Sequence, residues 1–427
     1  MRTRKAGTAR WVAGFAGLLL GASGVGPLAV AGEAVAPPSP GMRVADLVAL
    51  AWRDNATLAA ARAQWEAMQE APVVERALPN PMFFYGAMDR TDRFPGGDEQ
   101  RFKMEQTVPW PGKRGLKGRI AEQDAARMGF DYEAMRREIA MQVREGYYDL
   151  CATRKSRGIL EIEESVLKQL TRVAESRYSA GEVSQQDVAK AQAEITMVRA
   201  RRLELEAQET TLTARLNTLL NRPADAALSI AVEPPPRTAP VAPASLPVSA
   251  ETNRPEVMAS QTLAERSRLQ EALMRKEYLP DVTVGVEYRR FEDEDDMAMV
   301  MIGIDLPIWL RRNAAGVREA AKQLASNRAA VEAARRAAQF DARDAAFKLQ
   351  TAQRTLELYE KELVPQAERR FTASDAGYRA GKVDFMDLLE SERFLLNARL
   401  MQVMAEGSLG MQQARLERAS GPGAGGE

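Results

Sequence analysis

Alternating apolar and polar residues mark four short segments of this chain. The clearest are residues 282–288 and 300–306, in which every second residue is apolar, and residues 102–108 show the same pattern. Residues 82–90 alternate less cleanly because three aromatic residues stand in a row. A period of two is typical of β-strands with one apolar face, and about ten residues is the length of a tilted transmembrane strand. We therefore predict strand pairs at about 79–108 and about 280–307; a soluble hairpin packed on a helix fits the same pattern.

Most of the remaining sequence has the charged composition and helical spacing of long α-helices. After residue 187, apolar residues recur at alternating steps of three and four up to residue 219, with two polar interruptions. Such a heptad seam is typical of coiled-coil packing, although a long helical hairpin in a soluble bundle has the same spacing. We expect Pro365 to kink its helix, because proline removes a backbone donor. The predicted helical segments are single helices at 44–77 and 254–278 and helical hairpins at 113–221 and 313–419.

The chain is internally duplicated. The segment Tyr178-Ser-Ala-Gly181-Glu-Val183 recurs 200 residues later as Tyr378-Arg-Ala-Gly381-Lys-Val383, and Leu78-Pro79-Asn80 recurs as Leu279-Pro280-Asp281. Each copy therefore contains a leading helix, a strand pair and a helical hairpin, in that order. Residues 232–250 are rich in proline and read as a linker. The predicted organisation is a first repeat at 32–231, this linker, a second repeat at 251–419 and a disordered, glycine-rich tail at 420–427.

The first 31 residues have the pattern of a secretory signal peptide. Four basic residues precede the apolar block 11–20, and Ala29 and Ala31 suit the positions before a cleavage site. An uncleaved membrane anchor is the alternative, since residues 11–31 carry no charge. Only about ten of these residues are densely apolar, which is too short for a spanning helix. We expect cleavage after Ala31.

Composition excludes several classes of function. The 427 residues include 59 basic and 59 acidic residues, no histidine and a single cysteine, Cys151. The absence of histidine removes imidazole catalysis and histidine metal sites, and one cysteine forms neither an intramolecular disulfide nor a multi-cysteine cluster. A balanced charge gives no general attraction to nucleic acid. We therefore expect no enzyme, no cofactor and no nucleic-acid partner.

Together, the secretory start, the duplicated strand pairs and the Tyr-x-x-Gly turns resemble the TolC-like outer-membrane efflux family. The resemblance covers about residues 42–419, and its most specific marks are the turns at 178–187 and 378–387. The run Pro109-Trp110-Pro111-Gly112-Lys113 is similar to the branch that serves heavy-metal cation efflux. The implied fold is an α+β membrane protein with four transmembrane β-strands and long coiled-coil helical hairpins per protomer. Three protomers would form a twelve-stranded β-barrel, continued by an α-helical periplasmic tunnel.

The resemblance also implies a function and partners. The chain would be a passive outer-membrane channel with a periplasmic extension, exporting metal cations from the periplasm to the exterior. Its partners would be two further copies in a homotrimer, a periplasmic adaptor, an inner-membrane pump of the resistance-nodulation-division type and outer-membrane lipid. A drug or organic-solute channel and a protein secretion channel share this fold. A soluble periplasmic coiled-coil adaptor is the rival from another class, but it would not need four amphipathic strands.

Candidate site residues follow from matching the family turns position by position. Asp387 and Glu390 match two acidic positions after the second turn. The resemblance implies that these residues form rings of carboxylates at a periplasmic gate. The alternative interpretation is that they are two solvated acidic residues at the start of a helix. Tyr378 and Asp187 match residues that tie the two hairpins together in the closed state. The arginine common in that latch is replaced by Val383, beside Lys382. Asp384 adds one more carboxylate at the predicted mouth.

The turns themselves are the predicted adaptor-docking tips, and Gly181, Val183, Gly381 and Val383 are their candidate contact residues. Among the 19 methionines, Met299 and Met301 fall by alternation on the polar, lumen-facing side of their strand. Thioethers suit copper(I) and silver, but methionine usually fills gaps in cores. We therefore expect no metal site.

Overall fold

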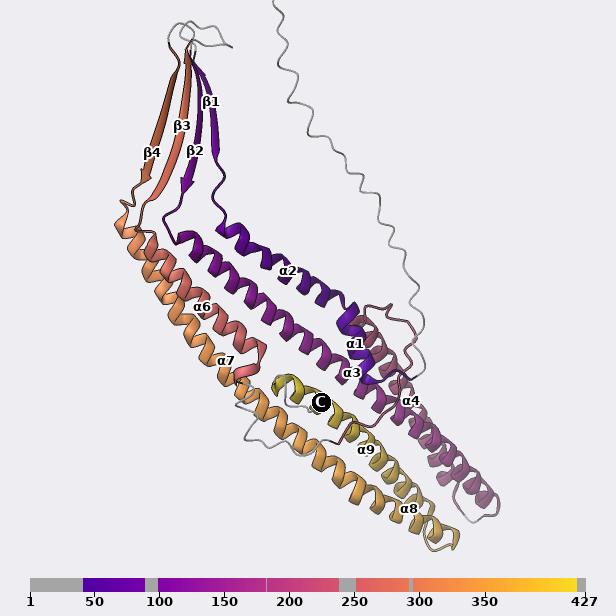
Figure 1. Ribbon diagram of the computed structural model, residues 1–427. Coiled ribbons are helices and arrows are strands. Elements are labelled where there is room, and N and C mark those ends of the chain that lie inside the picture. Colours follow the sequence, from indigo (N-terminus) through magenta and orange to yellow (C-terminus); the bar gives the residue numbers. More distant parts are fainter. Residues whose placement is uncertain (1–40, 89–98, 182, 238–250, 292–294, 421–427) are drawn as a thin grey trace, which may run out of the picture. The chain divides into compact units, whose positions relative to one another are not determined.

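The computed structural model describes residues 41–88, 99–181, 183–237, 251–291 and 295–420. The predicted signal peptide, most of the predicted linker and residues 421–427 of the predicted tail lie outside these residues. Figure 1 shows the arrangement of the helices and strands in the described part of the chain. Their bounds, in chain order, are α1 (Val44–Asp54), α2 (Ala56–Arg76), β1 (Met82–Met88), β2 (Glu99–Val108), α3 (Lys113–Ser179), α4 (Gln185–Leu219), α6 (Pro255–Lys276), β3 (Asp281–Phe291), β4 (Met297–Asp305), α7 (Leu310–Leu358), η1 (Tyr359–Leu363), α8 (Val364–Arg379) and α9 (Phe385–Ser420).

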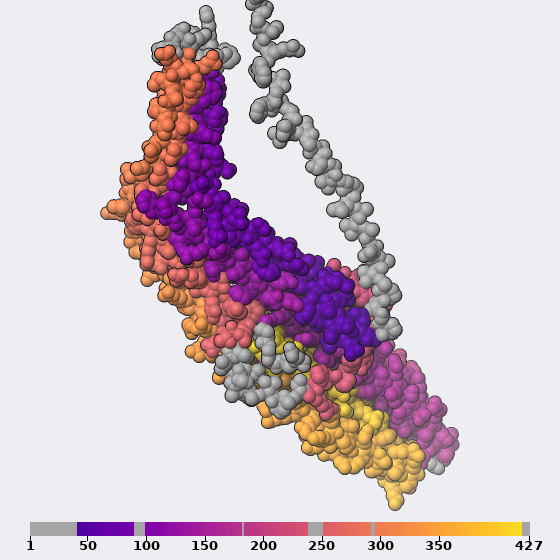
Figure 2. Space-filling model, viewed as in Figure 1, coloured from indigo at the N-terminus to yellow at the C-terminus, as the bar shows by residue number. Residues whose placement is uncertain are grey.

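Both predicted strand pairs form, and they join into one antiparallel sheet in the order β1-β2-β3-β4 (Figure 1). The two repeats meet at the β2–β3 pair, where Phe102 lies opposite Tyr288 and Val108 opposite Val282. Phe102 also packs against Tyr85 of β1, with ring centroids 5.2 Å apart. The space-filling view shows the purple first pair beside the orange second pair (Figure 2). Each repeat therefore supplies half of the sheet, as the duplication predicts.

The junction between sheet and helices uses the Pro109–Lys113 run. Gly112 has φ +90°, which allows the chain to turn sharply before α3 begins at Lys113. The Lys113 ammonium is buried and donates to the carboxylate of Asp281 at 2.9 Å, and the Trp110 amide donates to the same carboxylate at 2.8 Å. This motif thus fixes the first repeat to the first residue of β3 in the second repeat.

Helix α3 contains 67 residues, roughly 100 Å at 1.5 Å rise per residue. It packs against α1, α2, α4, α6 and α9, so it is the central helix of the described chain. On α4, the heptad seam predicted from the sequence faces α3, with Ala191, Val198, Leu212 and Leu216 buried. The first helical hairpin and its coiled-coil seam are therefore present.

The single helix predicted at 44–77 is wrong, because the chain has two helices there. Asn55 leaves the helical conformation with ψ 120°, ending α1 and capping α2. Its side-chain oxygen accepts a hydrogen bond from the Leu58 amide at 3.0 Å, and its amide donates to the Leu219 carbonyl at 2.8 Å. A local cap and a tertiary contact together outweigh the continuation of the helix.

The second hairpin is irregular where the sequence predicts a kink at Pro365. The chain forms one π-helical turn at Tyr359–Leu363, in which the Val364 amide bonds to the Tyr359 carbonyl, and α8 then begins with Pro365 in its first turn. Proline lacks an amide donor and is tolerated at a helix start. The disruption is therefore a widened turn between α7 and α8, and the helix resumes directly.

Two clusters form most of the helical core. One joins α1, α3 and α4 and includes Tyr147, Cys151 and Leu216. The other lies toward the turns, joins α3, α4, α8 and α9, and includes Leu160, Tyr378 and Leu388. Burial raises the pKa of the Cys151 thiol to about 11. The second cluster packs the two hairpins of the duplication against each other.

No helix in the described part of the chain is both long enough and apolar enough to cross a membrane.

Candidate functional site

The two predicted tips are tight turns that need glycine. Gly181 has φ +75° and Gly381 has φ +67°, in the left-handed region that other residues avoid. Each glycine amide donates to a tyrosine carbonyl three residues earlier, at 2.9 Å for Tyr178 and 3.1 Å for Tyr378. Apart from the adjoining residues, no atom of the described chain lies within 4 Å of a Cβ placed on either glycine. The turns are therefore equivalent in the two repeats and open toward their surroundings.

The acidic residues next to the turns cap the helices that follow. Asp187 accepts hydrogen bonds from the Ser184 amide at 3.2 Å and from the Ser184 hydroxyl at 3.0 Å, which is a capping box for α4. Asp384, which precedes α9, accepts a hydrogen bond from the Asp387 amide in the first turn of the helix at 2.8 Å. Val183 and Val383 are half-buried, and Val383 packs against Gly377.

Asp387 and Glu390 are both exposed on the first turns of α9. The Glu390 carboxylate pairs with the Arg370 guanidinium of α8 at 3.0 Å, and this guanidinium also lies 5.3 Å from the centre of the Phe394 ring. The sequence matching did not identify Arg370. It places a positive charge beside one of the two predicted gate carboxylates.

Tyr378 lies in the cluster between the hairpins and is only 3% exposed. Its ring packs 5.7 Å from the ring of Phe385. The Arg177 guanidinium lies 4.3 Å from the centre of the Tyr378 ring and donates to the Tyr378 carbonyl at 3.1 Å. The end of α3 is thus joined to the second turn through a cation–π contact and a hydrogen bond, and Arg177 is a further residue that the sequence matching missed.

Two buried carboxyl groups meet between α3 and α9. Glu163 and Glu392 are 5% and 3% exposed, and the two carboxyl groups are close enough to influence each other's pKa. Burial raises the pKa of both groups, and the neighbouring carboxyl raises that of Glu163 further, while Arg399 opposes the shift. Two carboxyl groups at one buried site disfavour ionisation of both. The helical spacing of apolar residues in α3 could have identified Glu163, because it lies between Leu160 and Leu167 on the face that these leucines bury.

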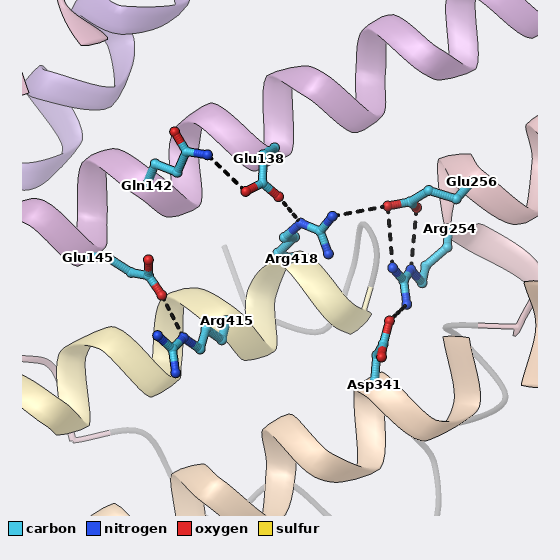
Figure 3. A network of polar contacts seen from close by, with 8 residues as sticks. All are labelled: Glu138, Gln142, Glu145, Arg254, Glu256, Asp341, Arg415 and Arg418. Atoms are coloured by element: carbon cyan, nitrogen blue, oxygen red, sulfur yellow. Dashed lines mark hydrogen bonds and ion pairs between the residues drawn. The ribbon is translucent and has the colours of Figure 1, made fainter. Parts of the chain in front are cut away.

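A polar network connects the far end of α9 to three other helices (Figure 3). Arg418 pairs with Glu138 of α3 at 2.5 Å and with Glu256 of α6 at 3.5 Å. Arg254 contacts Glu256 at 3.3 Å and Asp341 of α7 at 2.8 Å. These contacts join both repeats and fix α9 at the end opposite its turn.

The sheet has two chemically different faces. One carries aromatic and aliphatic side chains, of which Val300 and Ile302 are 72% and 73% exposed. On the other face, ion pairs run along β2 and β3, including Arg101 with Glu287 at 3.3 Å and Lys103 with Glu105 at 2.5 Å. In the described residues, no group of three or more histidine, cysteine, aspartate or glutamate side chains could hold a metal ion. This sheet therefore suits an apolar environment on one face and water on the other.

Comparisons with known proteins agree with this geometry. The family described as outer membrane efflux protein matches residues 47–222 and 246–422. The chain is 24% identical over 394 residues to the cobalt-zinc-cadmium resistance protein CzcC of Cupriavidus metallidurans, covering 88% of each chain. A crystal structure of CusC has a TM-score of 0.77 at 15% identity, covering 89% of this chain and 92% of CusC. The outer membrane protein VceC of Vibrio cholerae has a TM-score of 0.75 at 19% identity, covering 90% and 97%.

A two-faced sheet built from both repeats and carried on long helical hairpins defines an outer-membrane channel protein rather than an enzyme. The two matched segments lie one in each repeat and span most of the sequence, so the chain belongs to the outer membrane efflux protein family. The predicted family, the predicted outer-membrane location and the prediction that the chain is not an enzyme are thereby confirmed. The roles of the gate and tip residues stay predictions.

Proposed function

We propose that the chain is the outer-membrane channel component of a tripartite efflux system, a passive conduit from the periplasm to the exterior. The observation that carries the proposal is the open sheet. In the described residues, β1 and β4 each have a strand neighbour on one side only. Lipid does not tolerate unpaired strand edges, and closure removes them.

The strand directions make such closure straightforward. Because all neighbours are antiparallel and the number of strands is even, β4 runs opposite to β1. The β4 edge of one copy therefore pairs antiparallel with the β1 edge of a second copy in the same orientation. Cyclic rings are the usual form of such assemblies. The family resemblance supports three copies, which give a twelve-stranded barrel with the charged face inside and the helices continuing as a periplasmic tunnel.

The proposed cargo is metal cations. The name of the relative CzcC, a cobalt-zinc-cadmium resistance protein, supports this choice, as does the Pro109–Lys113 run. In the proposed system an inner-membrane pump supplies the energy, and a periplasmic adaptor docks at the turns around Gly181 and Gly381. Asp387 and Glu390 are the proposed gate carboxylates at the periplasmic mouth, with Tyr378 and Asp187 holding the hairpins together.

Assembly is tested by measuring the mass of the protein extracted from membranes in mild detergent. We expect three protomers, and a well-folded, water-soluble monomer would contradict the proposal. Ile302→Arg puts a charge on the exposed apolar face and should prevent insertion, at a cost of about 2–4 kcal/mol near the bilayer centre. The matched control is Met301→Arg, one residue along on the polar face, which should still insert.

Cargo is tested separately in cells that lack the gene. We expect them to become sensitive to cobalt, zinc or cadmium, and the wild-type gene to restore tolerance. Sensitivity to organic solutes without any change toward metals would instead identify a drug channel of the same fold.

A further inference from the structure

Three methionines follow one another on the polar face of β4. Met297, Met299 and Met301 lie two residues apart, opposite Arg289, Glu287 and Gly285 of β3. A Cβ built on Gly285 would lie 3.2 Å from the Glu105 Cγ and 3.5 Å from the Met301 Cε. The Met301 thioether therefore lies on the face that carries the ion pairs, and strand alternation places Met297 and Met299 there as well.

The opposite edge of the sheet also carries methionine on this face. Met82 and Met88 of β1 lie opposite Glu105 and Glu99 of β2. Phe84 between them has the Lys103 ammonium 5.6 Å from its ring centre, which confirms the orientation of the strand. Both edges of the sheet thus present thioethers on the polar face.

These side chains are not packed into a core. Met82, Met88, Met297 and Met299 are between 41% and 55% exposed. Methionine normally fills irregular gaps in apolar interiors, and that role does not explain exposed methionines on the charged side of a sheet. Binding of a ligand that prefers sulfur would explain their position.

Closure of the sheet brings the two edges together. If β4 of one copy pairs with β1 of the next, the strands lie about 4.7–4.9 Å apart. Up to five thioethers then face the interior at each junction between copies. Facing Cβ atoms in such pairs are about 4.5–5.5 Å apart, and methionine has three rotatable side-chain bonds. Two or three sulfur atoms from neighbouring positions can therefore surround one ion.

We propose that these methionines form binding sites for soft monovalent cations, Ag(I) or Cu(I), on the inner wall at each junction between copies. The proposal rests on the proposed function, because the second edge comes from another copy. Thioethers are uncharged and prefer soft ions over zinc or cobalt.

The carboxylates on this face do not compete with the thioethers for cations. On β2 and β3, Glu99, Glu105 and Glu287 are paired with Arg101, Lys103 and Arg289. The ion pairs neutralise the carboxylates, so divalent cations gain little there. Several weak sulfur sites along one wall would bind an ion and still release it, as conduction requires.

The test measures silver binding to the purified oligomer in chloride-free buffer by isothermal titration calorimetry with silver nitrate. The variant M297L/M299L/M301L keeps the size and apolar character of the side chains and should bind Ag(I) at least about tenfold more weakly. The control M104L changes a methionine that is 50% exposed on the apolar face of β2, and it should bind silver like the wild type. Zinc nitrate is the comparison ion: any binding at the proposed gate carboxylates should be equal in all three proteins, because thioethers have little preference for zinc.

Two outcomes overturn the inference: wild-type oligomer that binds no silver, and a triple variant that binds silver as tightly as the wild type. If the triple variant does not fold, M82L/M88L on the other edge provides the same test. Oligomer mass and conductance are measured first on the wild type. A chain that neither assembles nor conducts contradicts the proposed function, whereas a conducting oligomer indifferent to silver contradicts only this inference.

Discussion

Replacing Gly407 by alanine should loosen the contact between α9 and α3, through which the two repeats pack together. Gly407 is buried on α9, and a Cβ there would lie 2.8 Å from the Ala152 Cβ and 3.3 Å from the Tyr148 carbonyl oxygen. Neither neighbour can rotate away, because one is a backbone atom and the other is attached directly to the backbone. The two helices must therefore separate.

The expected size of the effect combines two opposing contributions. Overpacking of this kind costs about 1–3 kcal/mol, and the higher helix propensity of alanine returns about 1 kcal/mol. We expect a net loss of about 0–2 kcal/mol in the free energy of unfolding. Gly158→Ala on α3 is the matched control, since a Cβ there would have no described atom within 4 Å apart from its chain neighbours and the nearby backbone of its own helix. This control should gain about 1 kcal/mol.

Thermal unfolding of the detergent-solubilised protein, followed by circular dichroism, measures the difference between the two variants. For a chain of this size, 1 kcal/mol moves the midpoint by roughly 1–2 °C, so the two midpoints should differ by a few degrees. Gly407→Ala with a midpoint equal to or above that of Gly158→Ala would refute the close packing of α9 on α3.

Three further predictions concern the interface between the hairpins, the tips and the mouth. The raised pKa values of Glu163 and Glu392 mean that the folded state holds their protons more tightly than the unfolded chain. The pair therefore contributes stability that is fully present below the ordinary pKa of about 4.5 and is lost as pH rises toward about 9, the folded-state pKa of Glu163. E163Q/E392Q should flatten this fall in the unfolding midpoint between pH 5 and 8, and an unchanged slope would contradict the buried pair. Gly181→Val with Gly381→Val should strain both turns and abolish metal efflux, measured as metal tolerance of the cells. The oligomer should still insert, as checked by membrane fractionation. Normal efflux in this variant would argue against docking at the tips. Asp387→Ala with Glu390→Ala should remove most of the block of bilayer current by multivalent cations, and block equal to the wild type would move the gate elsewhere.

Periodicity predicted the sheet and the hairpins because their residues are sorted by environment. A period of two located β3 and β4 to within a few residues, and the heptad spacing on α4 identified the face that packs on α3. The repeat also identified equivalent turns, and their glycines, Gly181 and Gly381, both have positive φ. These features depend on local pattern, which the sequence displays directly.

Features that depend on long-range partners could not be predicted in this way. No residue near Asn55 in the sequence indicates its hydrogen bond to the Leu219 carbonyl. The break between α1 and α2 was therefore not predicted. The pairing of Glu390 with Arg370 and the position of Arg177 over Tyr378 likewise depend on how two helices align across the fold. Matching to a family identified Glu390 and Tyr378 near the turns, but not the arginine side chains that contact them.

The chain is already suited to site-specific labelling. Cys151 is 5% exposed in the core between α1, α3 and α4, and burial raises the pKa of its thiol to about 11. Thiol-directed reagents attack the thiolate, so this cysteine should remain unreacted at neutral pH without being removed. A single cysteine introduced at Ser179 or Ser184, beside the first turn, would then carry a spin label or fluorophore alone. In the proposed oligomer, distances between labels on different copies could then be measured in an otherwise native sequence.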